Sequence, residues 1–200
     1  MQGIQLVVGL GNPGTKYSDT RHNAGFWFLN ALRLDYNLSF AAESKFKAEI
    51  ARATVESRTV WFAAPTTFMN LSGQAVAAIA RFYKIPAEEI LVIHDELDLP
   101  PGTVRLKEGG GCGGHNGLTD IAEKLGSKSF MRLRIGIGHP GYSDQVLAYV
   151  LKRPTAEEQK LIGESIDRAR AQFDRILRGE HQVAMTELHT QPNPKTKNEK

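Results

Sequence analysis

Residues 6–25 read LVVGLGNPGTKYSDTRHNAG, and the rest of the predicted fold is arranged around them. The apolar run from Ile4 to Val8 predicts a buried strand, and a polar loop follows it before an amphipathic segment begins near Asn23. The loop carries Asn12 and His22. Because ligands of open α/β sheets bind outside the carboxyl ends of the strands, this loop is predicted to form the floor of a functional site.

Apolar spacing in the rest of the chain alternates between the helical and the strand period. It predicts helices over 24–36, 71–84 and 118–125 and a long one from 155 through Ile176, and strands over 46–54, 57–64, 90–94, 103–107 and 131–138. The first two of these strands are expected to pair as a hairpin. Together the elements predict one α/β domain over residues 1–188, with a twisted mixed sheet flanked by helices, and a disordered tail over 189–200.

Composition and charge exclude several classes of protein. The 25 Lys and Arg against 22 Asp and Glu give a net charge of +3, which permits an anionic partner without requiring one. Cys112 is the single cysteine, which excludes an internal disulfide and a zinc site built on several cysteines. The N-terminus has no signal-peptide pattern, and no apolar run approaches the roughly 18 residues of a membrane span. We therefore expect a soluble, cytoplasmic protein.

A nucleotide-dependent oxidoreductase is one alternative, because Gly9, Gly11 and Gly14 match the G-x-G-x-x-G pattern of dinucleotide-binding folds. In that fold an apolar helix begins at the last glycines, whereas the segment after Gly14 is polar. The acidic residue expected about twenty positions later is Asp35, which falls inside a helical pattern. A phosphate-binding P-loop is also disfavoured, because Thr15 and not lysine follows Gly14.

Five polar side chains are expected to converge. Asn12, Asn70 and Asp95 follow strands, and they share one rim of the sheet if those strands are parallel. His22 lies at the same rim, and Asn116 opens a later helix. Taken singly, these residues could be a turn position, two helix N-caps, a surface acid and a histidine packed on its own helix. Their convergence favours a site.

The same residue types are suited to hydrolysis. A histidine with a pKa near ~6.5 takes a proton from water at neutral pH, and a carboxylate on its other nitrogen fixes the tautomer. Asparagine amides orient the water and donate to a developing oxyanion. No G-x-S-x-G motif is present. Cys112, three residues before His115, is an alternative nucleophile, although a thiol among glycines is more often incidental.

A metal site is a further alternative, because the run His94, Asp95 and Glu96 could combine with other histidines of the chain. Along a strand, however, His94 and Glu96 point to one face and Asp95 to the other, so the run cannot chelate as a block. The chain also lacks the H-E-x-x-H motif. We therefore expect no metal.

Five stretches carry a resemblance that covers most of residues 4–150. They are VGLGNPGTKYSDTRHNAGF at 8–26, PTTFMNLSGQAV at 65–76, HDELDLPPGTVRLKEGGG at 94–111, GGHNGL at 113–118 and RLRIGIGHPG at 132–141. In these stretches the chain closely resembles the bacterial-type peptidyl-tRNA hydrolases. The resemblance implies an α/β fold around a mixed sheet and a monomeric enzyme that cuts the ester between a peptide and the terminal ribose of tRNA. It implies no metal or organic cofactor.

The resemblance also implies roles for individual residues. His22 is the implied general base, and Asp95 is the carboxylate that orients it. The residues implied to bind the peptide end and the water are Asn12, Asn70 and Asn116. Those implied to line the substrate-binding cleft are Tyr17, Met69 and His115. The implied clamp for the 5′-phosphate of tRNA consists of Lys107 and Arg134.

The alternation of the strand over 131–138 agrees with this clamp. It places Arg132 and Arg134 on a polar face that can meet an anion. One departure is Thr119, which stands where the family usually has a basic residue. A non-catalytic relative that only binds nucleic acid is a further alternative, against which the intact His22 and Asp95 argue.

Overall fold

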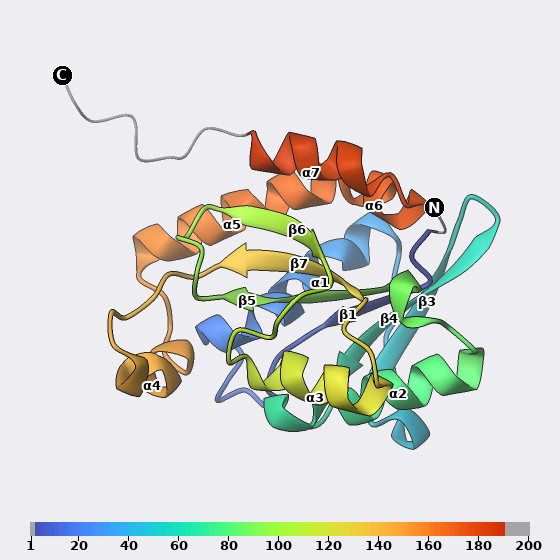
Figure 1. Ribbon diagram of the computed structural model, residues 1–200, viewed down its shortest axis with the longest axis horizontal. Helices are drawn as coiled ribbons and strands as arrows, with labels where there is room; N and C mark the ends of the chain where they lie inside the picture. Colours follow the sequence, from blue (N-terminus) through green and yellow to red (C-terminus); the bar gives the residue numbers. More distant parts are fainter. Residues whose placement is uncertain (1–2, 191–200) are drawn as a thin grey trace.

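The computed structural model describes residues 3–190, and its centre is a seven-stranded mixed sheet (Figure 1). The strands lie in the order β2-β3-β4-β1-β5-β7-β6. β4, β1, β5 and β7 run parallel, whereas β2, β3 and β6 pair antiparallel with their neighbours. Their bounds are β1 (Leu6–Gly9), β2 (Ala41–Glu43), β3 (Ala48–Val55), β4 (Arg58–Pro65), β5 (Ile90–Glu96), β6 (Val104–Glu108) and β7 (Met131–Gly136).

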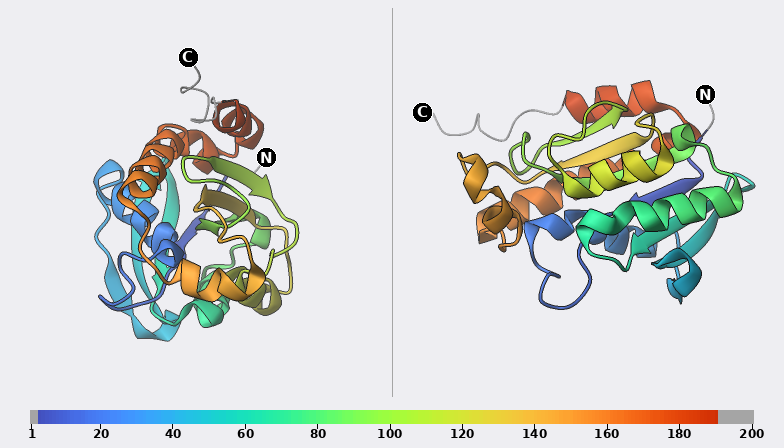
Figure 2. Two further views of the ribbon diagram at one scale, coloured as in Figure 1. Left: turned by 90° about the vertical axis from the view of Figure 1, so that its left-hand side faces the viewer. Right: turned by 60° about the horizontal axis from the view of Figure 1, so that its bottom comes forward.

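Helices cover both faces of this sheet (Figure 2). Their bounds are α1 (Ala24–Asp35), α2 (Ser72–Tyr83), α3 (Asn116–Leu125), α4 (Val146–Val150), α5 (Ala156–Ala171), α6 (Phe173–Arg178) and α7 (His181–His189). β1 shows why both faces are covered, because Val7 packs in the core with α1, α5 and α6, whereas Leu6 and Val8 pack in the core with α2 and α3. Its continuous apolar run is the pattern of a strand buried on both sides.

The fold class predicted from the sequence is confirmed, including the β3–β4 hairpin, whose register pairs Ala48 with Pro65 and Val55 with Arg58. β1 begins at Leu6 and not at Ile4, and β5 continues to Glu96, so Asp95 lies within the strand. The helix α1 begins at Ala24, well after the glycines of the first loop, which is unlike a dinucleotide-binding fold.

Four features of the fold were not predicted. The short elements β2 and α4 fall below the length at which periodicity is informative. α7 follows Gly179, which ends α6 in a left-handed conformation. The helix expected from Thr155 through Ile176 does begin with a capping box, but it is interrupted at Gln172. The interruption divides it into α5 and α6, with Phe173 and Ile176 both buried.

The predicted domain boundary at residue 188 falls within α7. α7 extends to His189, the first residue of the expected tail, and residues 191–200 lie outside the described residues. Among residues 3–190, no helix combines the length and the apolar character needed to cross a membrane.

Candidate active site

The carboxyl ends of the neighbouring parallel strands β1 and β5 bring predicted residues to one edge of the sheet. The loop after β1 carries Asn12 and ends in the 3-10 turn Arg21–Asn23, which holds His22. Asp95 is the last residue but one of the adjacent strand β5. His115 comes from farther along the chain, where it precedes α3 directly and caps its first turn. The predicted convergence of His22 and Asp95 is therefore confirmed.

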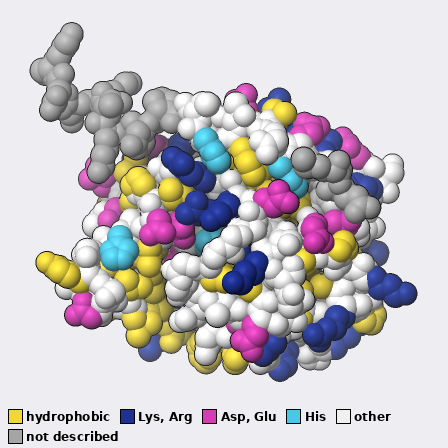
Figure 3. Space-filling model, viewed as in Figure 1, with side chains coloured by type: hydrophobic (Ala, Val, Ile, Leu, Met, Phe, Trp, Pro, Cys, Tyr) yellow, Lys and Arg dark blue, Asp and Glu magenta, His cyan; other side chains and the backbone are white. Residues whose placement is uncertain are grey.

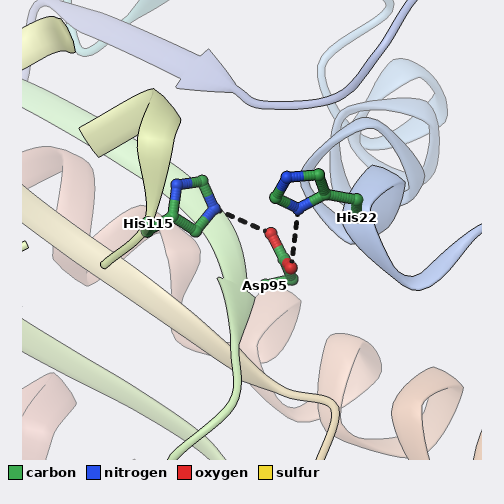
Figure 4. Close-up of side chains that lie close together, drawn as sticks. All are labelled: His22, Asp95 and His115. Atoms are coloured by element: carbon green, nitrogen blue, oxygen red, sulfur yellow. Dashed lines mark hydrogen bonds and ion pairs between the residues drawn. The ribbon is translucent and has the colours of Figure 1, made fainter. Parts of the chain in front are cut away.

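Asp95 lies between two imidazoles, and Figure 4 shows them approaching its carboxylate from opposite sides. Nδ1 of His22 lies 2.9 Å from Oδ2 of Asp95, and Nε2 of His115 lies 2.8 Å from Oδ1. The Asp95 side chain is 2% exposed, whereas those of His22 and His115 are 12% and 8% exposed. The sequence had placed His115 near the site, but not in direct contact with the carboxylate.

The hydrogen bonds assign different tautomers to the two histidines. Nδ1 of His115 accepts a hydrogen bond from the backbone N–H of Leu118 at 3.3 Å, so the proton of the neutral ring is on Nε2 and is donated to Asp95. His22 donates its Nδ1 proton to the same carboxylate, which leaves the lone pair on Nε2. Of the two rings, His22 is therefore the one with an unoccupied basic nitrogen.

Burial and charge set the protonation of this cluster. Burial disfavours a charge on His22, but attraction and hydrogen bonding to Asp95 outweigh it, and the pKa of His22 lies above its ordinary value. Burial also disfavours the charged form of Asp95, which by itself would raise its pKa. Attraction and hydrogen bonds from His22 and His115 nevertheless hold that pKa well below the usual range. Asp95 is therefore ionised at neutral pH. Beneath them, burial lowers the pKa of His94 to about 3, so this ring is neutral.

Asn12 is buried, and its side chain is partly occupied by contacts within the protein. Its Oδ1 accepts a hydrogen bond from the backbone N–H of Met69 at 2.7 Å. The side chain of Asn23 forms two hydrogen bonds with the backbone of Asn12. Its Oδ1 accepts from the Asn12 N–H at 2.8 Å, and its Nδ2 donates to the Asn12 carbonyl at 2.9 Å. Asn23 was not predicted as a site residue. Among residues 3–190 the amide nitrogen of Asn12 has no hydrogen-bond partner, so it is left to contact a substrate.

Asn70 and Asn116 are both exposed, and neither side chain has a hydrogen-bond partner among residues 3–190. The interpretation of these residues as helix N-caps is wrong. The N-cap of α2 is Leu71, without a side-chain hydrogen bond, and the N-cap of α3 is His115. Both amides are consequently free to bind a ligand.

Tyr17 and Met69 lie on the same side of the molecule as Asn12. Tyr17 is half-buried against the edge of the Phe68 ring, with the ring centroids 6.2 Å apart, and Met69 is buried. A hollow of about 1050 Å³ is lined by Asn12 but not by Tyr17, Met69 or His115. A substrate cleft lined by these three residues therefore stays a prediction.

Arg21, next to the histidine, is a residue that sequence reasoning missed. Its guanidinium is buried, stacks 3.9 Å from the centroid of the Tyr149 ring and donates to Glu158 at 2.8 Å. It also donates to the backbone carbonyl of Tyr149. The turn that carries His22 is thereby tied to α4 and to the start of α5, through contacts far apart in the sequence that no local pattern reveals.

The basic residues of β6 and β7 divide into exposed and buried ones. Lys107 pairs in register with Arg132, and Arg105 pairs with Arg134, so all four share one face. Figure 3 shows Lys and Arg side chains gathered over this part of the sheet. The expectation that Arg132 meets an anion is wrong, because its guanidinium is buried and donates to the carbonyl oxygens of the glycine loop at Gly110 and Gly111.

The cluster of His22, Asp95 and His115 is also the group of residues that could hold a metal. Within the described part of the chain, one ligand atom each from His22, Asp95 and His115 lie within 4.8 Å of one another. In the present geometry each imidazole instead places an N–H toward a carboxylate oxygen at hydrogen-bond distance. Hydrogen bonding accounts for the arrangement, and chelation would require both imidazoles to give up these protons.

Comparison with known proteins assigns the chain to a family. The model of the family described as peptidyl-tRNA hydrolase matches residues 6–198. The peptidyl-tRNA hydrolase of Neisseria meningitidis serogroup A is 54% identical over 187 residues, which cover 94% of this chain and 97% of that protein. That of Methylobacillus flagellatus is 54% identical over 190 residues, covering 95% and 98%. The crystal structure of the Acinetobacter baumannii peptidyl-tRNA hydrolase superposes with a TM-score of 0.92 at 45% identity, covering 95% of this chain and 96% of that one. The chain belongs to the peptidyl-tRNA hydrolase family.

Proposed function

We propose that this peptidyl-tRNA hydrolase cleaves the ester between a peptide and the terminal ribose of tRNA with His22 as its general base. The observation that carries this proposal is the hydrogen bond from Nδ1 of His22 to Asp95, which leaves the Nε2 lone pair available. The exposed fraction of His22, 12%, admits a water molecule while keeping the ring oriented by its neighbours.

In the proposed reaction, Nε2 of His22 removes a proton from water as the water oxygen attacks the ester carbon. The tetrahedral intermediate then collapses, the bond to the ribose oxygen breaks, and the imidazolium returns its proton to that oxygen. The products are a peptide carboxylic acid and a tRNA with a free ribose hydroxyl. Asp95 stays ionised throughout and stabilises the imidazolium that forms.

His115 acts on the carboxylate and not on water. Its Nε2 proton is donated to Asp95 and its Nδ1 accepts from the backbone of Leu118, so neither nitrogen is available as a base. Holding the second oxygen of Asp95 fixes the orientation of the first, on which the His22 tautomer depends. We therefore place His115 as a positioning residue.

The amide side chains are proposed to select and orient the substrate. Asn70 and Asn116 are exposed and unpartnered among the described residues, and the Asn12 amide nitrogen is left free by the contact of its oxygen with Met69. These groups can bond the neutral amide of a peptidyl group and the developing oxyanion. A free aminoacyl-tRNA instead presents a cationic amine, which must be desolvated to enter the site. Tyr17 and Met69 are proposed to line the same region.

Recognition of the tRNA is proposed to involve Lys107 and Arg134 at its 5′-phosphate. The support is their position, because both side chains are on one face of the antiparallel pair β6–β7, as diagonal neighbours about 7 Å apart at the backbone. Lys107 is exposed, and its ammonium lies beside Gly110. We further propose that the enzyme acts in the cytoplasm as a monomer.

The experiment that tests this function is hydrolysis of an N-acetylated aminoacyl-tRNA and of the same tRNA with a free amine, each with and without EDTA. We expect the blocked substrate to be cleaved much faster than the free one, and EDTA to leave the rate unchanged. Equal rates on the two substrates would refute the selection by asparagines, and loss of activity in EDTA would refute the metal-free mechanism. Binding of tRNA without cleavage would show a non-catalytic protein.

A further inference from the structure

Arg134, one of the two proposed phosphate ligands, is already engaged by an acid. Its Nε and its Nη2 both donate to Oε1 of Glu96, the former at 3.2 Å. The two side chains are only 20% and 16% exposed. The remaining nitrogen, Nη1, has no partner among the described residues. Glu96 therefore holds the guanidinium in one orientation while leaving one edge of it open.

The other exposed cations on this face carry no such restraint. Neither Arg105 nor Lys107 forms an ion pair within residues 3–190. Register pairing nevertheless places Arg105 beside Arg134, and Lys107 diagonally across from it. In Figure 3, acidic side chains lie at the edge of the basic group. An anion that approaches this face meets two free cations and one arginine that it must share with Glu96.

We infer that Glu96 makes this face selective for a terminal phosphate over the phosphodiesters of the tRNA backbone. The inference rests on the proposed role of Lys107 and Arg134. A terminal phosphate monoester carries a charge of about −1.5 to −2 at neutral pH and has three acceptor oxygens, whereas a diester carries a single charge. Because the attraction grows in proportion to charge, only the monoester competes well with a carboxylate that is already in place. Glu96 thus suppresses binding of Arg134 to internal phosphates, which would hold the tRNA at the wrong position along its backbone.

The location of Glu96 explains how this selectivity serves the reaction. Glu96 follows Asp95 directly in β5, so successive residues of one strand hold the phosphate-binding arginine on one face and the catalytic histidine on the other. Recognition of the end of the tRNA is in this way linked rigidly to the position of the base. A substrate bound by an internal phosphate would place its ester away from His22.

The test compares Michaelis constants for N-acetyl-aminoacyl-tRNA with its 5′-phosphate and after enzymatic removal of that phosphate. For the wild type we expect KM to rise about tenfold or more when the phosphate is removed, as expected for loss of charge-assisted hydrogen bonds. In Glu96→Gln the freed Arg134 binds internal phosphates, so KM for the 5′-hydroxyl substrate falls and the ratio of the two constants shrinks several-fold. Glu96→Asp, which retains the charge but retracts it, is expected to give an intermediate ratio.

Glu108→Gln is the matched control, since it removes an equal charge from an exposed residue on the opposite face of β6, and its ratio should equal that of the wild type. A substitution that only perturbs folding lowers kcat for both substrates and leaves the ratio unchanged. A wild type that discriminates, combined with an unchanged ratio in both Glu96 variants, overturns the inference. A wild type that does not discriminate overturns the proposed phosphate site itself.

Discussion

The His22→Ala variant is expected to lose about 10²–10⁴-fold in kcat/KM on N-acetyl-aminoacyl-tRNA, the contribution of a positioned general base. His22 supplies the unoccupied imidazole nitrogen among the three groups that meet at Asp95. Without it, water must be deprotonated by bulk solvent, although the substrate contacts proposed for the asparagines are retained. KM should consequently change less than kcat, which steady-state kinetics on the purified variant would measure.

A matched control is available in His139→Ala. His139 is exposed, and its Nδ1 accepts a hydrogen bond from the nearby backbone of Gly141. The His139→Ala variant should retain wild-type kinetics. Full activity in His22→Ala, with tRNA binding unchanged, would show that another group takes the proton.

Asp95→Asn is expected to cause a loss of similar size, about 10²–10⁴-fold in kcat, for a different reason. The carboxylate accepts from two imidazole N–H groups, whereas an amide offers one oxygen and one NH2 group. If the NH2 group faces His22, Nδ1 must accept and the proton moves to Nε2, which abolishes the base. If the oxygen faces His22, the NH2 group meets the N–H of His115, and two buried donors oppose one another.

This prediction is checked by single-turnover kinetics together with thermal unfolding of the variant. Asp98→Asn is the control, because Asp98 is an exposed acid three residues later and undergoes the same chemical change. A rate loss in Asp98→Asn as large as that in Asp95→Asn would point to a general charge effect. An Asp95→Asn enzyme with wild-type kcat would show that the tautomer of His22 does not depend on this carboxylate.

Much of the site could be predicted because it depends on the ends of strands. The apolar run that becomes β1 and the run that becomes β5 are visible in the sequence, and parallel neighbours necessarily present their following residues at one edge. The loop with Asn12 and His22 and the strand end with Asp95 therefore had to meet. The residue types that meet there, an amide, an imidazole and a carboxylate, indicate hydrolysis from the sequence alone.

The contacts that complete the site depend on loop paths that no periodicity encodes. His115 reaches Asp95 through a loop in which Gly109, Gly110, Gly113 and Gly114 all have positive φ, a conformation that glycine adopts readily. The carbonyl groups of that loop bury Arg132, although the alternation of β7 had predicted a polar face for it. A buried arginine without a carboxylate partner is identified only when the groups that solvate it are seen.

Pairings between distant segments escaped prediction for the same reason. The oxygen of Asn12 is held by the backbone of Met69, 57 residues away, and the Arg21 guanidinium by Glu158, 137 residues away. Both residues lie in polar segments, where sequence alone cannot distinguish a structural hydrogen bond from one kept for a substrate. Their positions follow from packing of the loops after the sheet has formed.

The proposed role of His22 as the base, with its proton held on Nδ1 by Asp95, is tested by nitrogen NMR of the imidazoles across a pH titration, compared with the pH profile of kcat/KM. A pKa raised above 6.5 means that His22 is protonated and inactive below it and acquires its lone pair as the pH rises. We predict a neutral His22 with its proton on Nδ1, a His115 with its proton on Nε2, and an acid limb of kcat/KM whose midpoint coincides with the His22 titration above 6.5. A neutral His22 that carries its proton on Nε2, or an acid limb that does not follow the His22 titration, would show that His22 is not the base.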